Sequence, residues 1–285
     1  MEVKRIGIVG AGQMGSGITE VIVSAGFHAL MRDITPEALE RGKRRIEADL
    51  ERRVQKGKMT LNEQQSVLRQ LSTTTRLDDF RSCDFVIEAA TEQVSLKKEI
   101  FQALDEITGQ EAILASNTSS ISITRIASFT RKPDRVIGIH FFNPAPVMKL
   151  IEIIRGMATS EDTWQTARDL CLKFGKTPVE AKDLPGFISS RLIFSYMNEG
   201  VYAFHEGLGK AEEIDTIMKM GANHPMGPLE LADLVGLDTV YSVMQILQEA
   251  FGDKYRPCPL LRKYVDAGYL GVKTGRGFYP YGDKK

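Results

Sequence analysis

Residues 5–17 read Arg-Ile-Gly-Ile-Val-Gly-Ala-Gly-Gln-Met-Gly-Ser-Gly, and no other stretch says more about the architecture of this chain. Its first five residues are typical of a buried strand, and a helical pattern continues from it to Ala25. The three glycines between strand and helix, Gly10, Gly12 and Gly15, permit a tight turn and let the backbone approach a pyrophosphate at the helix N-terminus. The spacing therefore predicts a strand–turn–helix unit that binds a dinucleotide.

A second short strand, residues 28–31, follows this helix and leads to Asp33. In a dinucleotide-binding unit, an acid at the end of the second strand bonds the hydroxyls of the adenosine ribose. A carboxylate there would also repel the 2′-phosphate of NADP, so we expect the cofactor to be NAD.

Strand-like and helical patterns alternate through the first two thirds of the chain. Apolar runs typical of buried strands recur at residues 85–90, 112–116, 135–139 and 150–154, with helical patterns between most of them. Such alternation is typical of a mostly parallel sheet with helices on both faces.

The pattern changes near Asp183, beyond which strand-like runs vanish and the segments between prolines have helical periodicity. We therefore predict an α/β fold in two domains. Residues 1–183 should form a Rossmann-type doubly wound sheet that binds NAD, with a polar helical hairpin inserted at about residues 36–71. Residues 184–285 should form an all-helical domain for substrate binding and dimerisation.

Composition excludes several classes of protein. The 285 residues carry 37 basic and 37 acidic side chains, a balance that points away from nucleic acid or an anionic membrane as the main partner. No apolar run approaches the roughly 20 residues of a membrane span, and we expect no signal or transit segment. The three scattered cysteines lack metal-ligand spacing, so we expect free thiols in a reducing cytoplasm and no metal.

His140 and Glu152 are the pair most suggestive of chemistry. Glu152 is a lone carboxylate in the apolar run 150–154, and a buried carboxylate without a partner is costly. Of the four histidines, His140 is nearest in sequence and follows an apolar run of its own. A histidine oriented by a buried carboxylate is a general acid/base arrangement, although a core histidine beside a structural acid has the same pattern.

Two further segments have both a structural and a functional interpretation. Residues 116–120, Ser-Asn-Thr-Ser-Ser, follow a strand directly. Ser120 or Ser122 suits a helix N-cap, whereas Asn117 and Ser119 could face the nicotinamide and the substrate oxygen.

Residues 41–58 hold eight basic and three acidic side chains, an excess in an otherwise neutral protein. Arg52 and Lys56 share a helix face because they are four residues apart. Such a run is usually a solvated surface; the alternative is a dock for a phosphorylated substrate handle.

Five motifs spread over nearly the whole chain resemble the L-3-hydroxyacyl-CoA dehydrogenases, especially the stand-alone bacterial 3-hydroxybutyryl-CoA dehydrogenases. The four motifs that follow residue 100 are far more specific than the glycine fingerprint at residues 10–15. They are Gly-Ala-Gly-Gln-Met-Gly (10–15), Ala-Ser-Asn-Thr-Ser-Ser (115–120), His-Phe-Phe-Asn-Pro-Ala-Pro-Val-Met-Lys-Leu (140–150), Ala-Asn-His-Pro-Met-Gly-Pro-Leu (222–229) and Lys-Thr-Gly-Arg-Gly-Phe-Tyr (273–279).

The resemblance implies hydride transfer between C3 of a 3-hydroxyacyl-CoA and the nicotinamide of NAD. His140 would exchange the hydroxyl proton, Glu152 would orient and charge-stabilise His140, and Ser119 would bond the substrate oxygen. Arg52 and Lys56 match positions that hold the CoA phosphates. Residues that match family positions around the cofactor are Gly10, Gly12, Gln13, Met14, Gly15, Asp33, Glu92, Lys97, Asn117, Asn143 and Lys273.

One position departs from the family pattern. After Pro185-Gly186-Phe187 the family usually has x-x-Asn-Arg, and that Asn contacts substrate; here Ser190 takes its place. Serine is shorter, so we expect Ser190 to reach the substrate through water, if at all. The resemblance further implies a homodimer formed through the helical domain, and from the length we expect no fused hydratase domain. The alternatives are a dehydrogenase for a hydroxy acid without CoA, or a weakly active structural relative like those of the lens.

Overall fold

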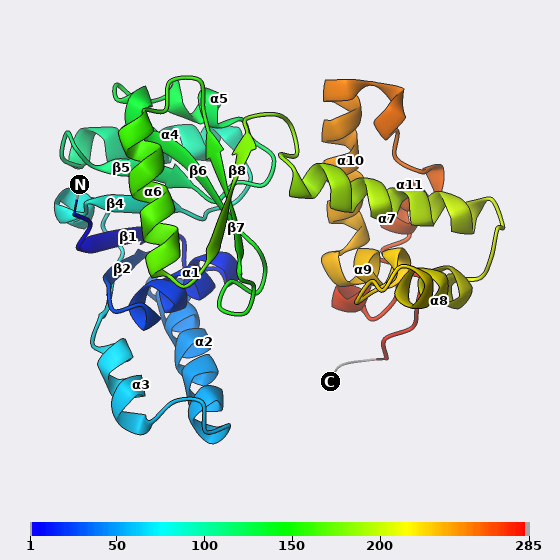
Figure 1. The fold of residues 1–285 in the computed structure, drawn as a ribbon, viewed down its shortest axis with the longest axis horizontal. Coiled ribbons are helices and arrows are strands. Elements are labelled where there is room, and N and C mark those ends of the chain that lie inside the picture. Colours follow the sequence, from blue (N-terminus) through cyan, green and yellow to red (C-terminus); the bar gives the residue numbers. More distant parts are fainter. Residues whose placement is uncertain (1, 283–285) are drawn as a thin grey trace. The chain divides into compact units, whose positions relative to one another are not determined.

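The computed structural model describes residues 2–282 and divides into two compact units, one ending at Asp183 and the other beginning at Leu184. Figure 1 shows the first unit as a sheet flanked by helices and the second as helices alone. Among the described residues, no helix is both long and apolar enough to cross a membrane.

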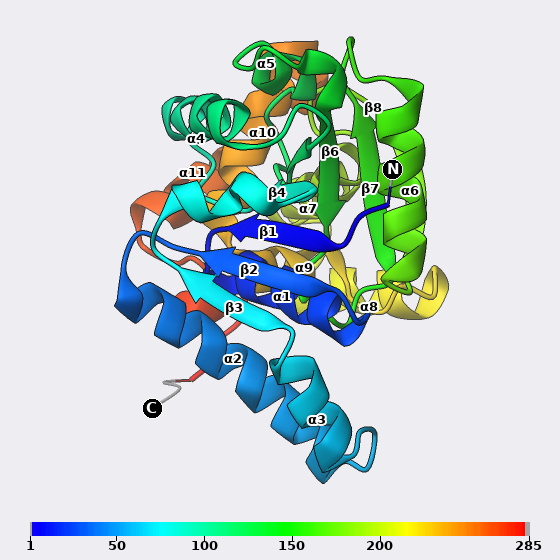
Figure 2. The same cartoon turned by 90° about the vertical axis from the view of Figure 1, so that its left-hand side faces the viewer.

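An eight-stranded sheet organises the first unit, in the order β3-β2-β1-β4-β5-β6-β7-β8 (Figure 2). Neighbouring strands run parallel except at β6 and β7, which are antiparallel. The strands are β1 (Arg5–Val9), β2 (His28–Arg32), β3 (Leu71–Thr74), β4 (Phe85–Glu88), β5 (Ile113–Ser116), β6 (Val136–Phe141), β7 (Leu150–Arg155) and β8 (Thr177–Lys182).

Helices connect most of these strands and begin at recognisable caps. The Thr35 hydroxyl accepts a hydrogen bond from the Ala38 amide, Thr60 and Glu63 form a capping box, and Ser160 caps another helix in the same way. The helices are α1 (Gln13–Ser24), α2 (Pro36–Gln55), α3 (Leu61–Leu68), α4 (Val94–Ile107), α5 (Ile123–Ala127) and α6 (Glu161–Lys173), with short 3₁₀ turns at Leu77–Ser82 and Pro133–Arg135.

The main core lies on one face of the sheet, against α1 and α6. Alternate strand residues such as Ile6, Ile87 and Ile139 pack there. Because successive side chains of a strand point to opposite faces, His140 and Glu152 lie on the other face, with Gly138. A Cβ on Gly138 would come within 2.8 Å of the Ile123 side chain, so α5 covers that face closely.

The hairpin of α2 and α3 has its own small core. Met31, Leu39, Ile46 and Leu50 are buried together beneath it. Gly42 is needed here, because a Cβ at that position would lie 2.8 Å from the Ala11 carbonyl oxygen. The rest of α2 is polar and exposed, which leaves its basic side chains in solvent.

The second unit is helical. Its core includes Met197, Leu229, Val240 and Leu247, with the half-buried aromatic ring of Phe278 packed against it. The helices are α7 (Ser189–His205), α8 (Ala211–Gly221), α9 (Pro228–Val235), α10 (Leu237–Phe251) and α11 (Pro259–Asp266), with 3₁₀ turns at Asp253–Tyr255 and Val272–Thr274.

The predicted fold class is confirmed, and the structure corrects the strand list. The sequence patterns predict neither outermost strand, β3 or β8, and the helical stretch predicted to reach Leu71 ends at Leu68. Each lies at an edge of the sheet and is largely solvent-exposed, so neither contains a long apolar run. Pro178 in β8 also weakened the strand signal, although an edge strand tolerates proline.

Candidate active site

His140 and Glu152 face each other across the antiparallel pair of β6 and β7. The His140 Nδ1 lies 2.9 Å from Glu152 Oε2, with 12% of the histidine side chain and 2% of the glutamate side chain exposed. The partner expected for the lone buried carboxylate is therefore present. Directly opposite positions in an antiparallel ladder bring Cβ atoms within about 5.5 Å, which fixes this contact by backbone register.

Asn117 adjoins the same strand. It follows β5, and its Oδ1 accepts a hydrogen bond of 2.9 Å from the backbone N–H of Phe141. Its own backbone N–H donates to the Glu88 carbonyl at 2.8 Å. Asn117 is thus held at the carboxyl ends of β4, β5 and β6, the edge at which parallel α/β sheets bind ligands.

Glu92 organises the segment that carries Ser119. Its Oε1 accepts hydrogen bonds from the Thr118 hydroxyl and, at 2.8 Å, from the Ser119 backbone N–H. Burial alone would raise the pKa of Glu92, but Lys97 and the bonds from Thr118 and Ser119 outweigh it and hold that pKa below its usual value. An ionised Glu92 therefore holds the backbone of Ser119 in place. Of the two serines suited to a helix N-cap, Ser122 is the one that caps α5.

Lys97 lies in a buried ionic network. Its Nζ is 2.7 Å and 2.8 Å from the two carboxylate oxygens of Glu88, and 3.1 Å from Glu92. The Ser116 hydroxyl donates to Glu88 at 2.6 Å. Glu88 is not among the residues predicted from the sequence, although it has the same signal as Glu152, a lone acid within an apolar strand.

The glycine-rich turn has the form that the fingerprint predicts. Gly10 has φ +111°, a conformation that L side chains rarely adopt, and a Cβ on Gly15 would lie 1.9 Å from the Gly10 carbonyl oxygen. A Cβ on Gly12 would meet nothing within 4 Å, so this side of the turn opens onto unfilled space. Backbone approach and open space together suit a pyrophosphate at the N-terminus of α1.

Asp33 lies just beyond β2, beside this turn. Its Oδ2 accepts a 2.7 Å hydrogen bond from the Ala11 N–H, and its Oδ1 accepts one of the same length from Ile34. The carboxylate is thereby oriented at the turn and retains further lone pairs for a ribose. The residues present therefore fit a dinucleotide with an unmodified 2′-hydroxyl.

Gln13 and Asn143, both predicted cofactor residues, link α1 to the segment after His140. Gln13, at the start of α1, donates from Nε2 to Asn143 Oδ1 at 3.0 Å. Met14, its neighbour, packs against the main core. The nucleotide turn and the His140 strand are consequently linked by side chains.

A groove runs between α1, α2 and the segment 143–146. Arg44, Arg45 and Arg52 line it from α2, and Gln13 and Ser16 line it from α1. Arg52 also forms an ion pair with Asp49. Lys56, at the C-cap of α2, is exposed and does not line the groove.

The two remaining predicted residues belong to the helical unit. Ser190 lies in the first turn of α7 and is buried, with 4% of its surface exposed. Lys273 lies in the 3₁₀ turn Val272–Thr274, and its Nζ donates to the Asp238 carboxylate.

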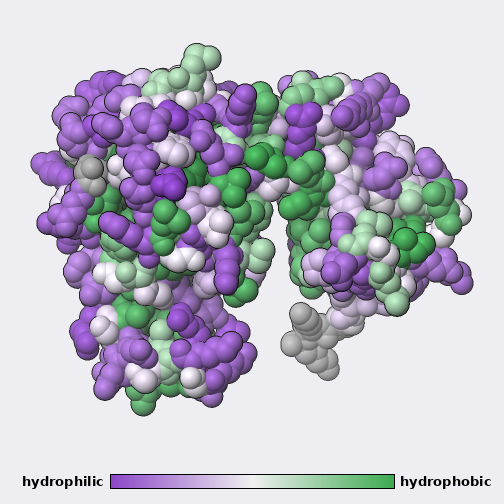
Figure 3. All heavy atoms as spheres, viewed as in Figure 1, coloured by the Kyte–Doolittle hydropathy of each residue, from purple (hydrophilic) through white to green (hydrophobic). Residues whose placement is uncertain are grey.

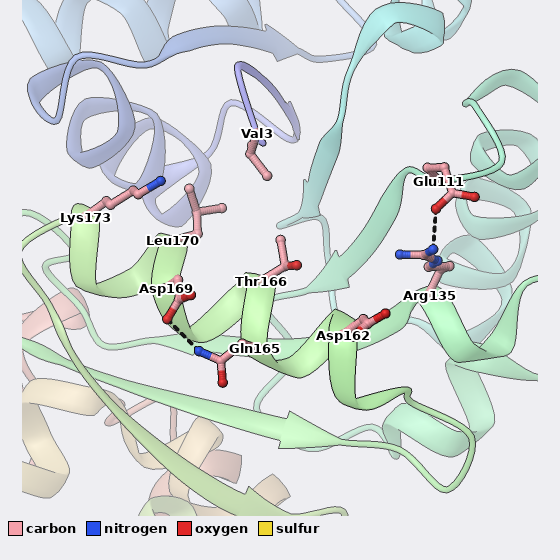
Figure 4. A pocket seen from close by; sticks show the side chains of 9 residues that line it. All are labelled: Val3, Glu111, Arg135, Asp162, Gln165, Thr166, Asp169, Leu170 and Lys173. Atoms are coloured by element: carbon pink, nitrogen blue, oxygen red, sulfur yellow. Dashed lines mark hydrogen bonds and ion pairs between the residues drawn. The ribbon is translucent and has the colours of Figure 1, made fainter. Parts of the chain in front are cut away.

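A second cavity of the sheet unit holds none of the predicted residues (Figure 4). Val3, Glu111 and Arg135 line it, just before the first residues of their strands, so it lies at the edge opposite the nucleotide turn. Its polar side chains are partly paired with each other, as in Arg135 with Glu111 and Gln165 with Asp169. The predicted catalytic and cofactor-binding residues of this unit gather instead at the carboxyl edge.

Comparison with known proteins covers both units. Residues 5–184 match the 3-hydroxyacyl-CoA dehydrogenase NAD binding domain, and residues 186–281 match the C-terminal domain of the same family. A probable 3-hydroxybutyryl-CoA dehydrogenase of Bacillus subtilis is 53% identical over 285 residues, 100% of this chain and 99% of that protein. A 3-hydroxybutyryl-CoA dehydrogenase of Bradyrhizobium diazoefficiens is 48% identical over 98% of this chain and 96% of its own length.

The fold is also that of a solved relative. The crystal structure of (S)-3-hydroxybutyryl-CoA dehydrogenase from Ralstonia eutropha superposes with a TM-score of 0.97 at 46% identity, covering 99% of this chain and 100% of that one.

Proposed function

The chain belongs to the 3-hydroxyacyl-CoA dehydrogenase family and is an NAD-dependent oxidoreductase, and from this premise we propose that it interconverts (S)-3-hydroxybutyryl-CoA and acetoacetyl-CoA. The contact between His140 and Glu152, made at the same edge of the sheet as the nucleotide turn, carries the proposal. Short acyl chains are favoured because the relatives described above are 3-hydroxybutyryl-CoA dehydrogenases.

His140 is the proposed general acid/base. Its Nδ1 faces Glu152, and Nε2 is the nitrogen that we propose exchanges a proton with the C3 oxygen. In oxidation Nε2 takes the hydroxyl proton, and in reduction it returns it. Glu152 holds the ring orientation and would offset the positive charge of the imidazolium that forms during oxidation.

Ser119 and Asn117 are the proposed polar contacts of the reacting centre. Glu92 fixes the Ser119 backbone, so the hydroxyl can donate to the substrate oxygen as charge develops there. Asn117 is oriented through Phe141, next to His140, and would present its amide to substrate or nicotinamide. Ser190 is the proposed substrate contact from the helical unit.

The bound NAD supplies the hydride acceptor in oxidation and the hydride donor in reduction. The turn Gly10–Gly15, which includes Gly12, Gln13 and Met14, would hold the pyrophosphate, and Asp33 the adenosine ribose. Glu92, Lys97, Asn143 and Lys273 are proposed as further cofactor contacts. For Lys97 the network with Glu88 implies an indirect part, since its ammonium is already bonded to carboxylates.

Arg52 and Lys56 are proposed to hold the phosphates of CoA. Arg52 lines the groove that leads past Asn143, and Lys56 continues the same face of α2 toward solvent. A flexible, exposed cation can bind a phosphate without a preformed pocket, but salt strongly weakens such a contact.

Initial rates with NADH and a series of thioesters test the function. We expect acetoacetyl-CoA to be reduced faster than longer 3-oxoacyl-CoA substrates, and NADH to exceed NADPH in kcat/KM. Asp33→Ala should narrow that cofactor preference. Absence of turnover with any 3-oxoacyl-CoA would favour a structural relative, and equal use of thioesters with and without CoA would favour a different hydroxy-acid substrate.

We further propose that the protein is cytoplasmic. We also propose that it forms a homodimer through its helical unit. Large apolar side chains are exposed on and around α8: Leu208 is 74% exposed, Ile217 66% and Met220 83%. Figure 3 shows apolar surface over this helix. Exposed apolar patches of this kind mark interfaces. Sedimentation should give a dimer, and Ile217→Asp should yield a monomer; a monomeric parent protein would refute the proposal.

A further inference from the structure

Lys176 is a buried cation that the mechanism above does not use. It immediately precedes β8 and is 7% exposed. Its Nζ donates to the carbonyl oxygen of Ala145 at 2.6 Å and to that of Met148 at 2.7 Å. Both acceptors lie in residues 142–149, which connect the strand of His140 to the strand of Glu152; we call this segment the β6–β7 loop.

Burying an ammonium group is expensive unless its charge and protons are matched. Carbonyl groups alone could be satisfied by water or backbone N–H donors, and an apolar side chain would avoid the desolvation cost. Lys176 is therefore an unusual choice for simple packing. Burial lowers its pKa, and Glu20 acts in the opposite direction, toward the charged form.

Glu20 lies on the helix that begins with the nucleotide turn. It is 1% exposed, and its Oε1 is 3.7 Å from Nη1 of Arg53 on α2. Both Glu20 and Lys176 line one cavity, together with Arg53, Lys58 and Lys173. The Glu20 carboxyl group thus lies among cations contributed by α2 and the turn after it, by the end of α6 and by the residue before β8.

The β6–β7 loop is tied to α1 at several points. Asn143 accepts from Gln13 in the first turn of α1. At Gly17 the helix approaches so closely that a Cβ would be 3.3 Å from Ala145 Cβ and from Pro146 Cδ. Inside the loop, the N–H groups of Val147 and Met148 both bond the Pro144 carbonyl at 3.0 Å. Lys176 adds hydrogen bonds to two further carbonyl groups of this loop.

We propose that Lys176 is a positioning residue, which clamps the β6–β7 loop and so keeps His140, Glu152 and Asn143 in register with the nucleotide helix. The consequence for catalysis rests on the proposed function, whereas the clamp itself does not. Since a displacement of about 1 Å can cost on the order of a hundredfold in rate, a loosened loop should show in kcat.

Lys176→Met removes the donors while keeping most of the side-chain volume, and Lys176→Arg restores them. Lys173→Met is the matched control, because Lys173 is an exposed lysine three positions earlier, at the end of α6. Amide hydrogen exchange would be followed in a peptide covering residues 142–149, and kcat would be measured with NADH and acetoacetyl-CoA. Lys176→Gln, which keeps one amide donor, replaces the Met variant if that variant does not fold.

We expect faster exchange confined to the loop peptide, and a fall in kcat of roughly tenfold to a hundredfold. Lys176→Arg should return both readings to within about threefold, and Lys173→Met should change neither. Unchanged loop exchange, or faster exchange throughout the sheet unit, would overturn the clamp. Faster loop exchange with kcat within twofold would overturn the positioning role. If the parent protein reduces no 3-oxoacyl-CoA, the proposed function fails while the exchange result still decides the clamp.

Discussion

Each unit of this protein contains a buried carboxylate whose partners differ in kind from those of the other. In the sheet unit, Glu152 faces the imidazole of His140, a group that can gain or lose a proton. In the helical unit, Asp233 accepts from the backbone N–H groups of Phe278 and Tyr279 at 3.0 Å and from the Tyr281 hydroxyl at 3.0 Å. Asp215 is held in the same manner by two backbone N–H groups and the Tyr279 hydroxyl.

The difference separates a chemical role from a structural one. A carboxylate beside a titratable ring can respond to a proton moved during a reaction. A carboxylate surrounded by fixed donors only holds chain segments together. Burial raises the pKa of Asp233, against its hydrogen bonds from Tyr279 and Phe278. The motifs 222–229 and 273–279 contribute residues to these structural networks, and a Cβ on Gly277 would lie 1.9 Å from Asp233 Oδ1.

The largest predicted effect is at His140. His140→Gln should lower kcat by about 10²–10⁴ because the general acid/base is lost. NADH should still bind and the melting temperature should barely change, as measured by fluorescence titration and calorimetry. Near-normal kcat would return His140 to the class of buried core histidines, and the contrast between the two units would lose its basis.

Asp233→Ala tests the structural half of the comparison. It leaves two backbone donors and a tyrosine hydroxyl without their acceptor, so the free energy of unfolding should fall by about 3–5 kcal/mol in urea titrations. The exposed Asp253 is the control, since Asp253→Ala should leave the urea midpoint almost unchanged. Turnover per folded Asp233→Ala molecule should stay within a few-fold; a hundredfold loss at full stability would give Asp233 a chemical role instead.

Glu20 gives a pH-dependent test within the sheet unit. Burial, then Asp49, raises the pKa of Glu20 to about 7, against Arg53, Arg52 and Lys176. Because this pKa is above the unfolded value, the folded protein binds the extra proton more tightly, and that stabilisation is lost as pH rises through 7. Relative to Glu20→Gln, the parent should lose roughly tenfold to a hundredfold in its folding equilibrium constant between pH 5 and 8.

Urea denaturation of both proteins at several pH values measures this difference. Parallel stability curves for the parent and Glu20→Gln would show that the carboxyl ionises normally, and Glu20 would then join the fixed, structural acids in the comparison.

Ser190→Asn tests the departure from the family pattern. A longer amide should reach the reacting oxygen, so we expect kcat to rise about tenfold, or 1.4 kcal/mol of transition-state stabilisation. KM should move less, because a contact that strengthens as charge develops appears mainly in kcat. A kcat within twofold of the parent's would mean that serine or an ordered water already makes this contact with the substrate.

The smallest effect concerns the exposed cations of α2. Replacing Arg52 and Lys56 by Ala should raise KM for acetoacetyl-CoA several-fold at low salt, and far less for an N-acetylcysteamine thioester, which lacks the phosphates. Arg41 and Lys43, exposed on the same helix and outside the groove, form the control pair with an equal charge change. Equal losses in both pairs would assign the whole basic run to a solvated surface.

Local patterns were enough to predict much of this molecule. The glycine turn, the acid after β2 and the alternation of buried strands with helices all lie within short windows, and the backbone conformations they specify are local. The exposed strands β3 and β8 escaped because a strand without a buried face has no apolar periodicity.

The sequence by itself determined the fold class and the nucleotide turn, and it indicated that the carboxylate of Glu152 needs a partner. Only the tertiary structure decided that His140 lies directly opposite it, since that contact follows from the reversal of β7 against β6 and from strand register. The network of Glu88, Lys97 and Glu92 and the clamp of Lys176 on the β6–β7 loop were likewise invisible in the sequence. Each joins residues from separate elements, and burial makes their partners obligatory without indicating which residues they will be.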